Sequence, residues 1–311
     1  MNKIAFVFSG QGAQQVRMGK ELYDNFSESK EVFDTASTIL GYDISRMCFE
    51  GPEEELMLTY NTQPAVLTMS IAAYKILNKK GIKPDVTAGL SLGEYSALVC
   101  SGALEFKDVV SFVKNRGRYM QDAVPYGIGG MAAIIGLTED QVMEVCDKSK
   151  DVGIIEAANF NCPGQIVISG EIAAIDKGCE VAIQMGALKA IKLSVSGPFH
   201  SSMMKKAYDK LVIDIEKLEV KQFEIPLISN VTADFIDNEE MLRRLMGLQV
   251  MCPVQWERTI RKMIDFGVDT FVEIGPGRAL SGFIRKVDKG LTVLNVEDLK
   301  SLEKTLNVIG G

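Results

Sequence analysis

The chain has 311 residues, 47% of them hydrophobic and 24% charged, which is ordinary for a globular protein with a sizeable core. Its 34 basic and 41 acidic residues give a net charge of −7, which argues against a nucleic acid partner. No apolar stretch reaches the roughly 18 residues of a membrane span, and the sequence does not start with a basic, cleavable leader. We therefore expect a cytoplasmic protein without a membrane anchor.

The six cysteines are scattered and form no C-x-x-C pair. This spacing indicates reduced, mostly buried thiols rather than a disulfide framework. With a single histidine and isolated cysteines, the sequence offers no ligand cluster for a metal ion, and none is expected.

The N-terminal segment predicts a strand followed by a glycine-rich loop. Residues 4–8 form an apolar run typical of a central parallel strand, and residues 9–14 form the loop. The loop has neither the dinucleotide-binding nor the Walker glycine spacing, so nucleotide binding is the weaker interpretation. Backbone N–H groups near Gln11 are instead expected to face a site at the strand ends. Helical spacing follows at residues 20–40 and 62–77.

A G-x-S-x-G motif at residues 89–93 predicts a nucleophile elbow, although glycine and serine also mark ordinary turns. Residues 84–88 are consistent with a loop and a short buried strand, and residues 94–104 with a helix. The motif therefore has the strand, turn and helix that it requires. Such a turn exposes the hydroxyl of Ser91 at the start of a helix, where free N–H groups favour negative charge.

A serine nucleophile needs a base, and His200 is the only histidine of the chain. It follows the Gly197-Pro198 break, which can hold a side chain rigidly across a cleft. Lone histidines in proteins are more often structural or simply exposed. If Ser91 is a nucleophile, however, His200 is the base that the sequence provides, because its ordinary pKa lies near neutrality.

The predicted helix at residues 109–123 carries Arg116 and Arg118. A pair of arginines on a helix usually belongs to a solvated face. Arginine is also the side chain best shaped to bind a carboxylate through two parallel hydrogen bonds. The sequence leaves both interpretations open at this point.

The middle of the chain predicts a separate small domain. After a glycine-rich joint, strands at 131–137, 153–159, 165–169 and 190–195 alternate with helices at 138–149 and 172–185 in the order βαββαβ. The predicted fold class is therefore α/β. A large α/β-hydrolase-like domain with a parallel sheet (residues 1–127 and 198–311) contains an inserted ferredoxin-like subdomain (residues 128–197).

The C-terminal part returns to the large domain. A helix is predicted at residues 257–266, followed by strands at 270–274 and 292–296 that complete the sheet. His200 lies just after the inserted subdomain, which places it at the mouth of the cleft between the domains. Clefts of this kind commonly bind ligands.

Seven separated motifs resemble one family, the malonyl-CoA:acyl carrier protein transacylases together with the acyltransferase domains of polyketide synthases. They span almost the whole chain in the family's order. The matching segments are residues 8–12, 89–95, 116–117, 197–200 and 230–232, Gln249 with 253–256, and residues 273–277.

The resemblance implies a role for each matched residue. Ser91, His200 and Gln249 would be catalytic: Ser91 carries the acyl group, His200 is general base and then acid, and the main-chain carbonyl of Gln249 orients the imidazole. The oxyanion hole would be formed by the N–H groups of Gln11 and Leu92.

Substrate binding would fall to Arg116, which pairs with the malonyl carboxylate, and to Phe199, which crowds the α-carbon and favours malonyl over methylmalonyl. The family usually has histidine at the position of Leu90, so this departure concerns rate or selectivity rather than the reaction.

The implied activity is an [acyl-carrier-protein] S-malonyltransferase for fatty acid synthesis. Its partners are malonyl-CoA, as a substrate, and acyl carrier protein, and it would need no cofactor and act as a monomer. Three rivals remain: an acyl hydrolase on the same scaffold, a polyketide acyltransferase acting in trans, and an inactive carrier-binding module. The acidic carrier protein is expected to dock on basic residues, for which the candidates are Lys189, Lys192, Lys205, Lys206, Arg278 and Lys286.

Overall fold

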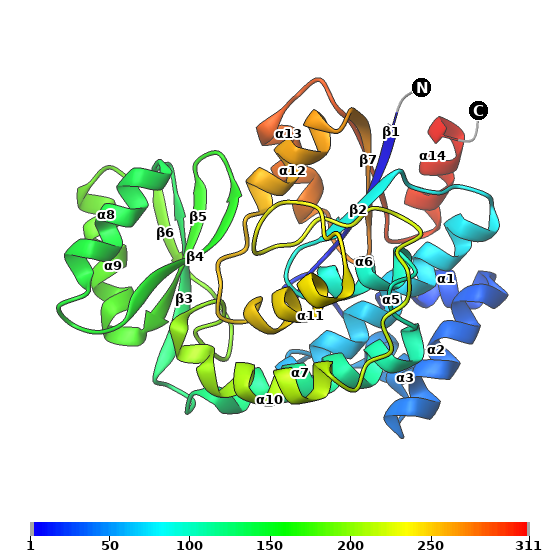
Figure 1. The fold of residues 1–311 in the computed structure, drawn as a ribbon, viewed down its shortest axis with the longest axis horizontal. Helices are drawn as coiled ribbons and strands as arrows, with labels where there is room; N and C mark the ends of the chain where they lie inside the picture. Colours follow the sequence, from blue (N-terminus) through cyan, green and yellow to red (C-terminus); the bar gives the residue numbers. More distant parts are fainter. Residues whose placement is uncertain (1–2, 310–311) are drawn as a thin grey trace.

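The computed structural model describes residues 3–309, which form two separate four-stranded sheets (Figure 1). The first sheet is parallel throughout, with strand order β2-β1-β7-β8. Its strands are β1 (Lys3–Phe8), β2 (Val86–Gly89), β7 (Val268–Ile274) and β8 (Thr292–Val296). The strands predicted at 4–8, 270–274 and 292–296 are thus confirmed.

Side chains of β1 alternate between two hydrophobic clusters, one on each face of this sheet. Phe6 and Phe8 belong to the larger cluster and Ala5 and Val7 to the smaller one, as the two-residue period of a strand requires. The smaller cluster is closed by two helices, α12 (Trp256–Asp265) and α13 (Ala279–Val287).

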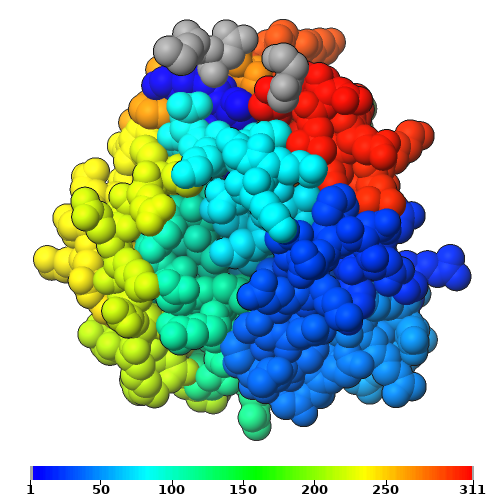
Figure 2. Space-filling view, turned by 90° about the vertical axis from the view of Figure 1, so that its right-hand side faces the viewer, coloured from blue at the N-terminus to red at the C-terminus, as the bar shows by residue number. Residues whose placement is uncertain are grey.

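The remaining helices of the large lobe contribute to the larger cluster. They are α1 (Lys20–Asn25), α2 (Ser27–Leu40), α3 (Ile44–Glu50), α4 (Glu53–Leu56), α5 (Thr59–Lys79), α6 (Gly93–Cys100), α7 (Phe106–Ala123), α10 (Lys205–Ile215), α11 (Glu239–Leu248) and α14 (Leu299–Ile309). Figure 2 shows the face remote from the second sheet, where the N-terminal helices and α14 lie together. The amide of Leu299 donates to the carboxylate of Glu21 there, at 3.3 Å.

Several predicted helix boundaries were wrong. The single helix expected at 20–40 is two helices, because Phe26 has an extended backbone (φ −131°, ψ 123°). The helix expected at 62–77 starts earlier, at Thr59, so Pro64 is its sixth residue and lies inside the helix, where it has no N–H to donate to the carbonyl of Tyr60. Six helices were not predicted at all: α3, α4, α10, α11, α13 and α14.

The second sheet is antiparallel, with strand order β4-β5-β3-β6. Its strands are β3 (Gly129–Ile135), β4 (Ile155–Cys162), β5 (Gln165–Glu171) and β6 (Lys189–Lys192). Two helices, α8 (Glu139–Ser149) and α9 (Ile172–Gln184), share a third hydrophobic cluster with this sheet. The predicted βαββαβ order is confirmed. Helix α8 starts with a capping box, in which Thr138 and Gln141 bond each other's backbone.

The two lobes are joined by backbone pairing as well as by the chain connections. Val254, just before α12, donates to Ala158 (2.8 Å) and accepts from Phe160 (2.9 Å), both on β4. Arg258 on α12 also forms an ion pair with Glu139 at the start of α8 (2.9 Å). The antiparallel sheet is thereby held against the carboxyl edge of the parallel sheet.

The turn from β2 into α6 is tight enough to require glycine on both sides of Ser91. A Cβ atom at Gly89 would lie 1.9 Å from the carbonyl carbon of Gly93, and one at Gly93 would lie 2.1 Å from the oxygen of Phe8. Ser91 itself has a positive φ of 52°, which is uncommon outside glycine. The elbow predicted from the motif is therefore present, and the close approach of backbone to backbone explains its glycines.

We predict that Gly93→Ala lowers the free energy of unfolding by about 2–4 kcal/mol, because the added methyl group meets fixed backbone. The matched control is Gly282→Ala. Gly282 is an exposed residue of α13 with open space around it, so this variant should gain about 0.5–1 kcal/mol. Urea unfolding of both variants checks the pair. Equal effects of the two substitutions would contradict the steric account of the elbow.

Candidate active site

The hydroxyl of Ser91 and the imidazole of His200 meet at the carboxyl edge of the parallel sheet. Ser91 Oγ lies 2.8 Å from His200 Nε2 although 109 positions separate the two residues. His200 also has a positive φ, of 58°, and its amide donates to the carbonyl of Val250 at 3.0 Å. Two non-glycine residues with left-handed backbone thus face each other, as is common where structure is strained for function.

The other imidazole nitrogen identifies the tautomer. His200 Nδ1 lies 2.8 Å from the main-chain carbonyl of Gln249, and because a carbonyl only accepts, Nδ1 carries the proton. Nε2 is then free to accept from the Ser91 hydroxyl. His200 is 3% exposed, and burial, with the nearby charge of Arg116, lowers its pKa to about 4. The imidazole is therefore neutral at pH 7 and able to take a proton.

The guanidinium of Arg116 is buried beside the serine and lacks an anionic partner. It is 1% exposed, and no carboxylate of residues 3–309 lies within 4 Å of it. Two neutral side-chain amides hold it instead: Nη1 donates to Gln63 Oε1 and Nη2 to Gln249 Oε1, each at 2.8 Å. Its Nη2 also lies 3.4 Å from Ser91 Oγ, and its Nε has no acceptor among the described residues.

These contacts distinguish the two arginines of α7, for which the sequence left a solvated face and a carboxylate-binding role both open. Arg116 points into the protein, while Arg118 is solvated, with a side chain that is 74% exposed and a long ion pair to Asp122. A buried cation with a free N–H group and neutral neighbours can bind a carboxylate strongly, because the charge is poorly compensated before the ligand arrives.

Two backbone N–H groups near Ser91 are unused. Neither Gln11 N nor Leu92 N has an acceptor within the part of the chain that the structure describes. The side chain of Gln11 is fixed by a hydrogen bond to Thr59 Oγ1 (3.3 Å), which in turn bonds Ser196 Oγ (2.8 Å). Unused donors held by a rigid loop and a helix start can stabilise negative charge that develops on a substrate oxygen.

Asn230 and Glu94 support the elbow in ways that the motif did not reveal. The side chain of Asn230 makes two hydrogen bonds, both at 2.6 Å: Oδ1 accepts from Ser91 N and Nδ2 donates to Gly89 O. The backbone N–H of Asn230 donates to Glu94 Oε2 at 2.8 Å. Both residues stood inside matched motifs, but nothing in their spacing from Ser91 indicated a contact. Gln63, which holds Arg116, carried no sequence signal either.

A cavity of about 240 Å³ opens above Ser91 and is lined by both lobes. Phe199 and Leu90 form part of its apolar wall, so at position 90 the cavity meets a hydrocarbon side chain. The small lobe contributes Asn159 and Asn161, and Asn161 Oδ1 is buried without a partner among the described residues. The cavity thus combines an apolar lining with a few convergent polar groups, as ligand sites usually do.

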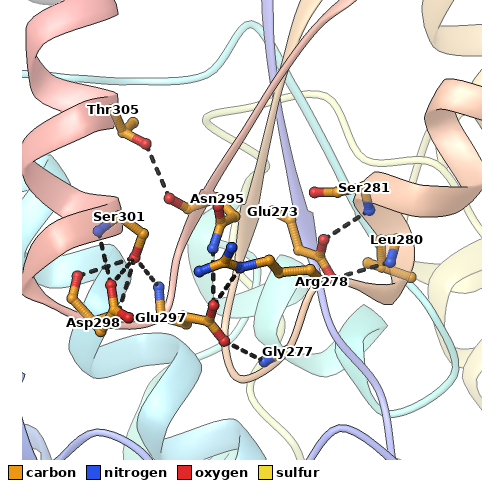
Figure 3. A network of polar contacts seen from close by, with 10 residues as sticks. All are labelled: Glu273, Gly277, Arg278, Leu280, Ser281, Asn295, Glu297, Asp298, Ser301 and Thr305. Carbon is orange, nitrogen blue, oxygen red and sulfur yellow. Dashed lines mark hydrogen bonds and ion pairs between the residues drawn. The ribbon is translucent and has the colours of Figure 1, made fainter.

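The first turn of α13 forms another wall of this cavity and is anchored by a buried carboxylate (Figure 3). Glu273, at the end of β7, accepts from the amides of Leu280 (3.0 Å) and Ser281 (2.7 Å). Glu297 accepts from the amide of Gly277 at 3.0 Å and pairs with Arg278. The motif at residues 273–277 therefore fixes the turn between β7 and α13, and burial raises the pKa of Glu273.

Of the six basic candidates for partner docking, three are paired with carboxylates of the chain itself. Lys192 pairs with Asp176, Lys205 with Asp209, and Arg278 with Glu297. Lys286 donates to Gln165 Oε1 at 3.3 Å and so bridges the two lobes. All three of these ion-paired side chains remain more than half exposed, so the docking of a carrier protein on the six basic residues stays a prediction.

Across residues 3–309, no group of three or more Cys, Asp, Glu and His side chains is arranged to hold a metal ion. Within the same residues, no helix has both the length and the apolar character needed to cross a membrane.

Comparison with known proteins gives consistent results. The family model described as "Acyl transferase domain" matches residues 5–303. The malonyl CoA-acyl carrier protein transacylase of Bacillus subtilis (strain 168) is 47% identical, covering 99% of this chain and 98% of its own length. A crystal structure of the enzyme of that name from Clostridium perfringens ATCC 13124 superposes with a TM-score of 0.95, at 51% identity over 99% of this chain and 97% of the other.

A further solved structure holds a type II PKS acyl-carrier protein in complex with its malonyl-transacylase. It superposes with a TM-score of 0.97, at 39% identity, and covers 99% of this chain and all (100%) of that chain.

We predict that the imidazole of His200 titrates with a midpoint near pH 4, because burial disfavours its charged form. As the pH falls from 6.5 to about 4, the unfolded chain takes up a proton that the folded chain refuses, so this histidine lowers stability across that window. With one histidine in the chain, a single imidazole resonance in an NMR titration gives the midpoint directly, and the urea-unfolded protein is the control. A folded-state midpoint at or above 6.5 would contradict the buried, neutral base.

Proposed function

This chain belongs to the acyl transferase family and, within it, to the malonyl CoA-acyl carrier protein transacylases, and on that premise we propose how it works. It transfers the malonyl group of malonyl-CoA to the phosphopantetheine thiol of an acyl carrier protein, for fatty acid synthesis, through an ester on Ser91. The observation that carries the proposal is the buried, unpaired guanidinium of Arg116, 3.4 Å from the Ser91 hydroxyl.

In the first half-reaction, Ser91 Oγ attacks the thioester carbonyl while its proton moves to His200 Nε2. The N–H groups of Gln11 and Leu92 stabilise the oxyanion, each by about 3 kcal/mol. Collapse of the tetrahedral intermediate breaks the carbon–sulfur bond, and His200 returns the proton to the departing CoA sulfur. The product is a malonyl ester on Ser91.

The second half-reaction is the reverse with a different thiol. The phosphopantetheine thiol of the carrier protein gives its proton to His200 and attacks the ester. The intermediate then expels Ser91 Oγ, which recovers the proton. One thioester is exchanged for another, so the reaction consumes no ATP and we propose no resident cofactor and no metal.

The main-chain carbonyl of Gln249 takes the place of the carboxylate in a Ser-His-Asp triad. It holds the imidazole in the correct tautomer, as the 2.8 Å contact with His200 Nδ1 supports. Phe199 and Leu90 line the apolar side of the cavity, and we propose that Phe199 crowds an α-substituent and so favours malonyl over methylmalonyl.

We also propose the domain division expected from the sequence. The large α/β-hydrolase-like domain comprises residues 1–127 and 198–311, and the small ferredoxin-like subdomain comprises residues 128–197. Strand order β4-β5-β3-β6 with antiparallel neighbours supports the second description. We further propose a monomer that works in the cytoplasm.

Two alternatives keep the same site. An acyl hydrolase would pass the ester to water, and malonate release without carrier protein, at a rate close to that of transfer, would favour it. A polyketide acyltransferase acting in trans would use a different carrier, and the complex with a type II PKS carrier protein in a similar structure gives this alternative its weight. Competition between carrier proteins for the malonyl-enzyme separates the two carriers.

Ser91→Ala should abolish the covalent malonyl adduct that intact-mass spectrometry detects after incubation with malonyl-CoA, because among residues 3–309 no other side chain is hydrogen-bonded to His200 Nε2. Ser27→Ala, on the exposed start of α2, is the control and should form the adduct as the unmodified protein does. An adduct that persists in Ser91→Ala would refute the proposed function.

Arg116→Ala should reduce the preference for malonyl-CoA over acetyl-CoA by about 10- to 100-fold, since a hydrogen bond to a charged group is worth about 1.5–3 kcal/mol. Arg118→Ala removes an arginine of the same helix that is solvated, and its preference should stay within twofold of the unmodified enzyme. Acylation rates with the two CoA esters give the ratio, which is independent of the amount of folded protein. An unchanged ratio in Arg116→Ala would place the carboxylate site elsewhere.

A further inference from the structure

We propose that the side chain of Gln249 is a positioning residue that links the carboxylate site at Arg116 to the oxyanion hole at Leu92. This inference rests on the proposed function and goes beyond the role of the Gln249 main-chain carbonyl. The side chain is 1% exposed and its amide makes two hydrogen bonds: Nε2 donates to Ser91 O at 3.0 Å, and Oε1 accepts from Arg116 Nη2 at 2.8 Å.

The first bond orients the oxyanion hole through peptide geometry. Ser91 C=O and Leu92 N–H belong to the same planar trans peptide, so the two groups point in opposite directions. The Ser91 oxygen accepts from Gln249 Nε2 at 3.0 Å and from the backbone N–H of Glu94 at 3.2 Å. Gln249 therefore acts together with the first turn of α6 to fix the direction of the Leu92 N–H, which is the side of the peptide without a protein acceptor among residues 3–309. The peptide between Leu90 and Ser91 is held as well, because the backbone N–H of Ser91 donates to Asn230 Oδ1 at 2.6 Å. The strained serine is thus held at both of its peptide bonds.

The second bond determines which way the Gln249 amide faces. Arg116 only donates hydrogen bonds, so the amide oxygen must point toward the guanidinium, and the NH₂ group is left facing Ser91 O. A flipped amide would set donor against donor on one side and acceptor against acceptor on the other. The arginine that is proposed to select the substrate therefore also sets the orientation of the group that aims the Leu92 N–H.

Gln63 offers a contrast within the same site. Its Oε1 accepts from the other terminal nitrogen of Arg116 at the same 2.8 Å distance, but it has no hydrogen bond to the Ser91–Leu92 peptide. A substitution at Gln63 disturbs the carboxylate site alone, whereas one at Gln249 disturbs both the carboxylate site and the oxyanion hole. Acetyl-CoA separates these effects, because its acyl group has no carboxylate for Arg116 to bind.

The test compares Gln249→Met with Gln63→Met. Methionine has similar length and no amide, and the main-chain carbonyl that orients His200 remains in Gln249→Met. We expect acylation by acetyl-CoA to slow about 100-fold in Gln249→Met, because a displaced oxyanion donor loses most of its effect. In Gln63→Met the same rate should fall much less, while both variants lose part of their preference for malonyl-CoA. Single-turnover acylation followed by intact mass gives the rates.

The titration midpoint of His200 is the second measurement, and it should stay the same in both methionine variants because the carbonyl contact is kept. If Gln249→Met does not fold, Gln249→Glu replaces it: this variant keeps an acceptor for Arg116 but has no donor for Ser91 O, so acetyl transfer should again be slow.

Acetyl-CoA acylation in Gln249→Met that is as fast as in the unmodified enzyme, or slowed equally in Gln63→Met, would overturn the inference. A shifted His200 midpoint that accompanies the rate loss would also overturn it, because the effect would then act through the imidazole. None of these results affects the assignment of Ser91 as the acylated residue, which the adduct measurement on Ser91→Ala tests separately.

Discussion

The site depends on a buried charge without an ion pair: within residues 3–309, no carboxylate lies within 4 Å of the Arg116 guanidinium. Removing a charge from water costs several kcal/mol, and among residues 3–309 the groups that contact the guanidinium are neutral: the amide oxygens of Gln63 and Gln249, and the ring of Tyr95 at 5.1 Å. A carboxylate in place of either amide would stabilise the arginine and compete with a malonyl group for it. The charge of Glu94 acts on Arg116, but burial raises the pKa of this carboxyl group to about 7, so its charge is only partly present near neutral pH.

His200, like Arg116, is held by a neutral group where a carboxylate could have served. In a Ser-His-Asp triad an aspartate orients the imidazole, whereas here a main-chain carbonyl does so. Among the described residues, no carboxylate lies within 4 Å of the Arg116 guanidinium. The imidazole keeps its tautomer, and burial keeps it neutral. Gln249 therefore serves the base with its backbone and the arginine with its side chain, which explains why one glutamine lies at the centre of the site.

The residues proposed to take part in the reaction were more predictable from the sequence than the residues that hold them in place. Ser91, His200, Arg116 and Gln249 lie in motifs with distinctive local patterns, and the structure brings all four together. Gln63 and Asn230 act through side-chain amides on residues 53 and 139 positions away, and such contacts leave no periodicity in a sequence. The basic residues proposed for partner docking were equally beyond prediction, because their pairing with nearby acids depends on the fold.

In the large lobe, the strands β1, β7 and β8 were predicted more reliably than the ends of α2 and α5, whereas the predicted strands of the small lobe differ by up to three residues at their ends. The apolar runs of β1, β7 and β8 are bounded by glycine or polar residues, which restricts where a buried strand can start and stop. The break at Phe26 was missed because an apolar residue satisfies the helical pattern on both sides, and only the backbone reveals it. The early start of α5 was missed because Thr59 and Asn61 are polar but buried.

A crystal structure of the enzyme trapped with a malonyl group tests the central claim most directly, namely that Arg116 is left unpaired so that it can receive the carboxylate of the acyl group. The account predicts an ester on Ser91 Oγ, its carbonyl oxygen between the amides of Gln11 and Leu92, and its carboxylate hydrogen-bonded to the Arg116 guanidinium. A malonyl carboxylate bound away from Arg116, with the guanidinium still surrounded only by Gln63 and Gln249, would contradict it.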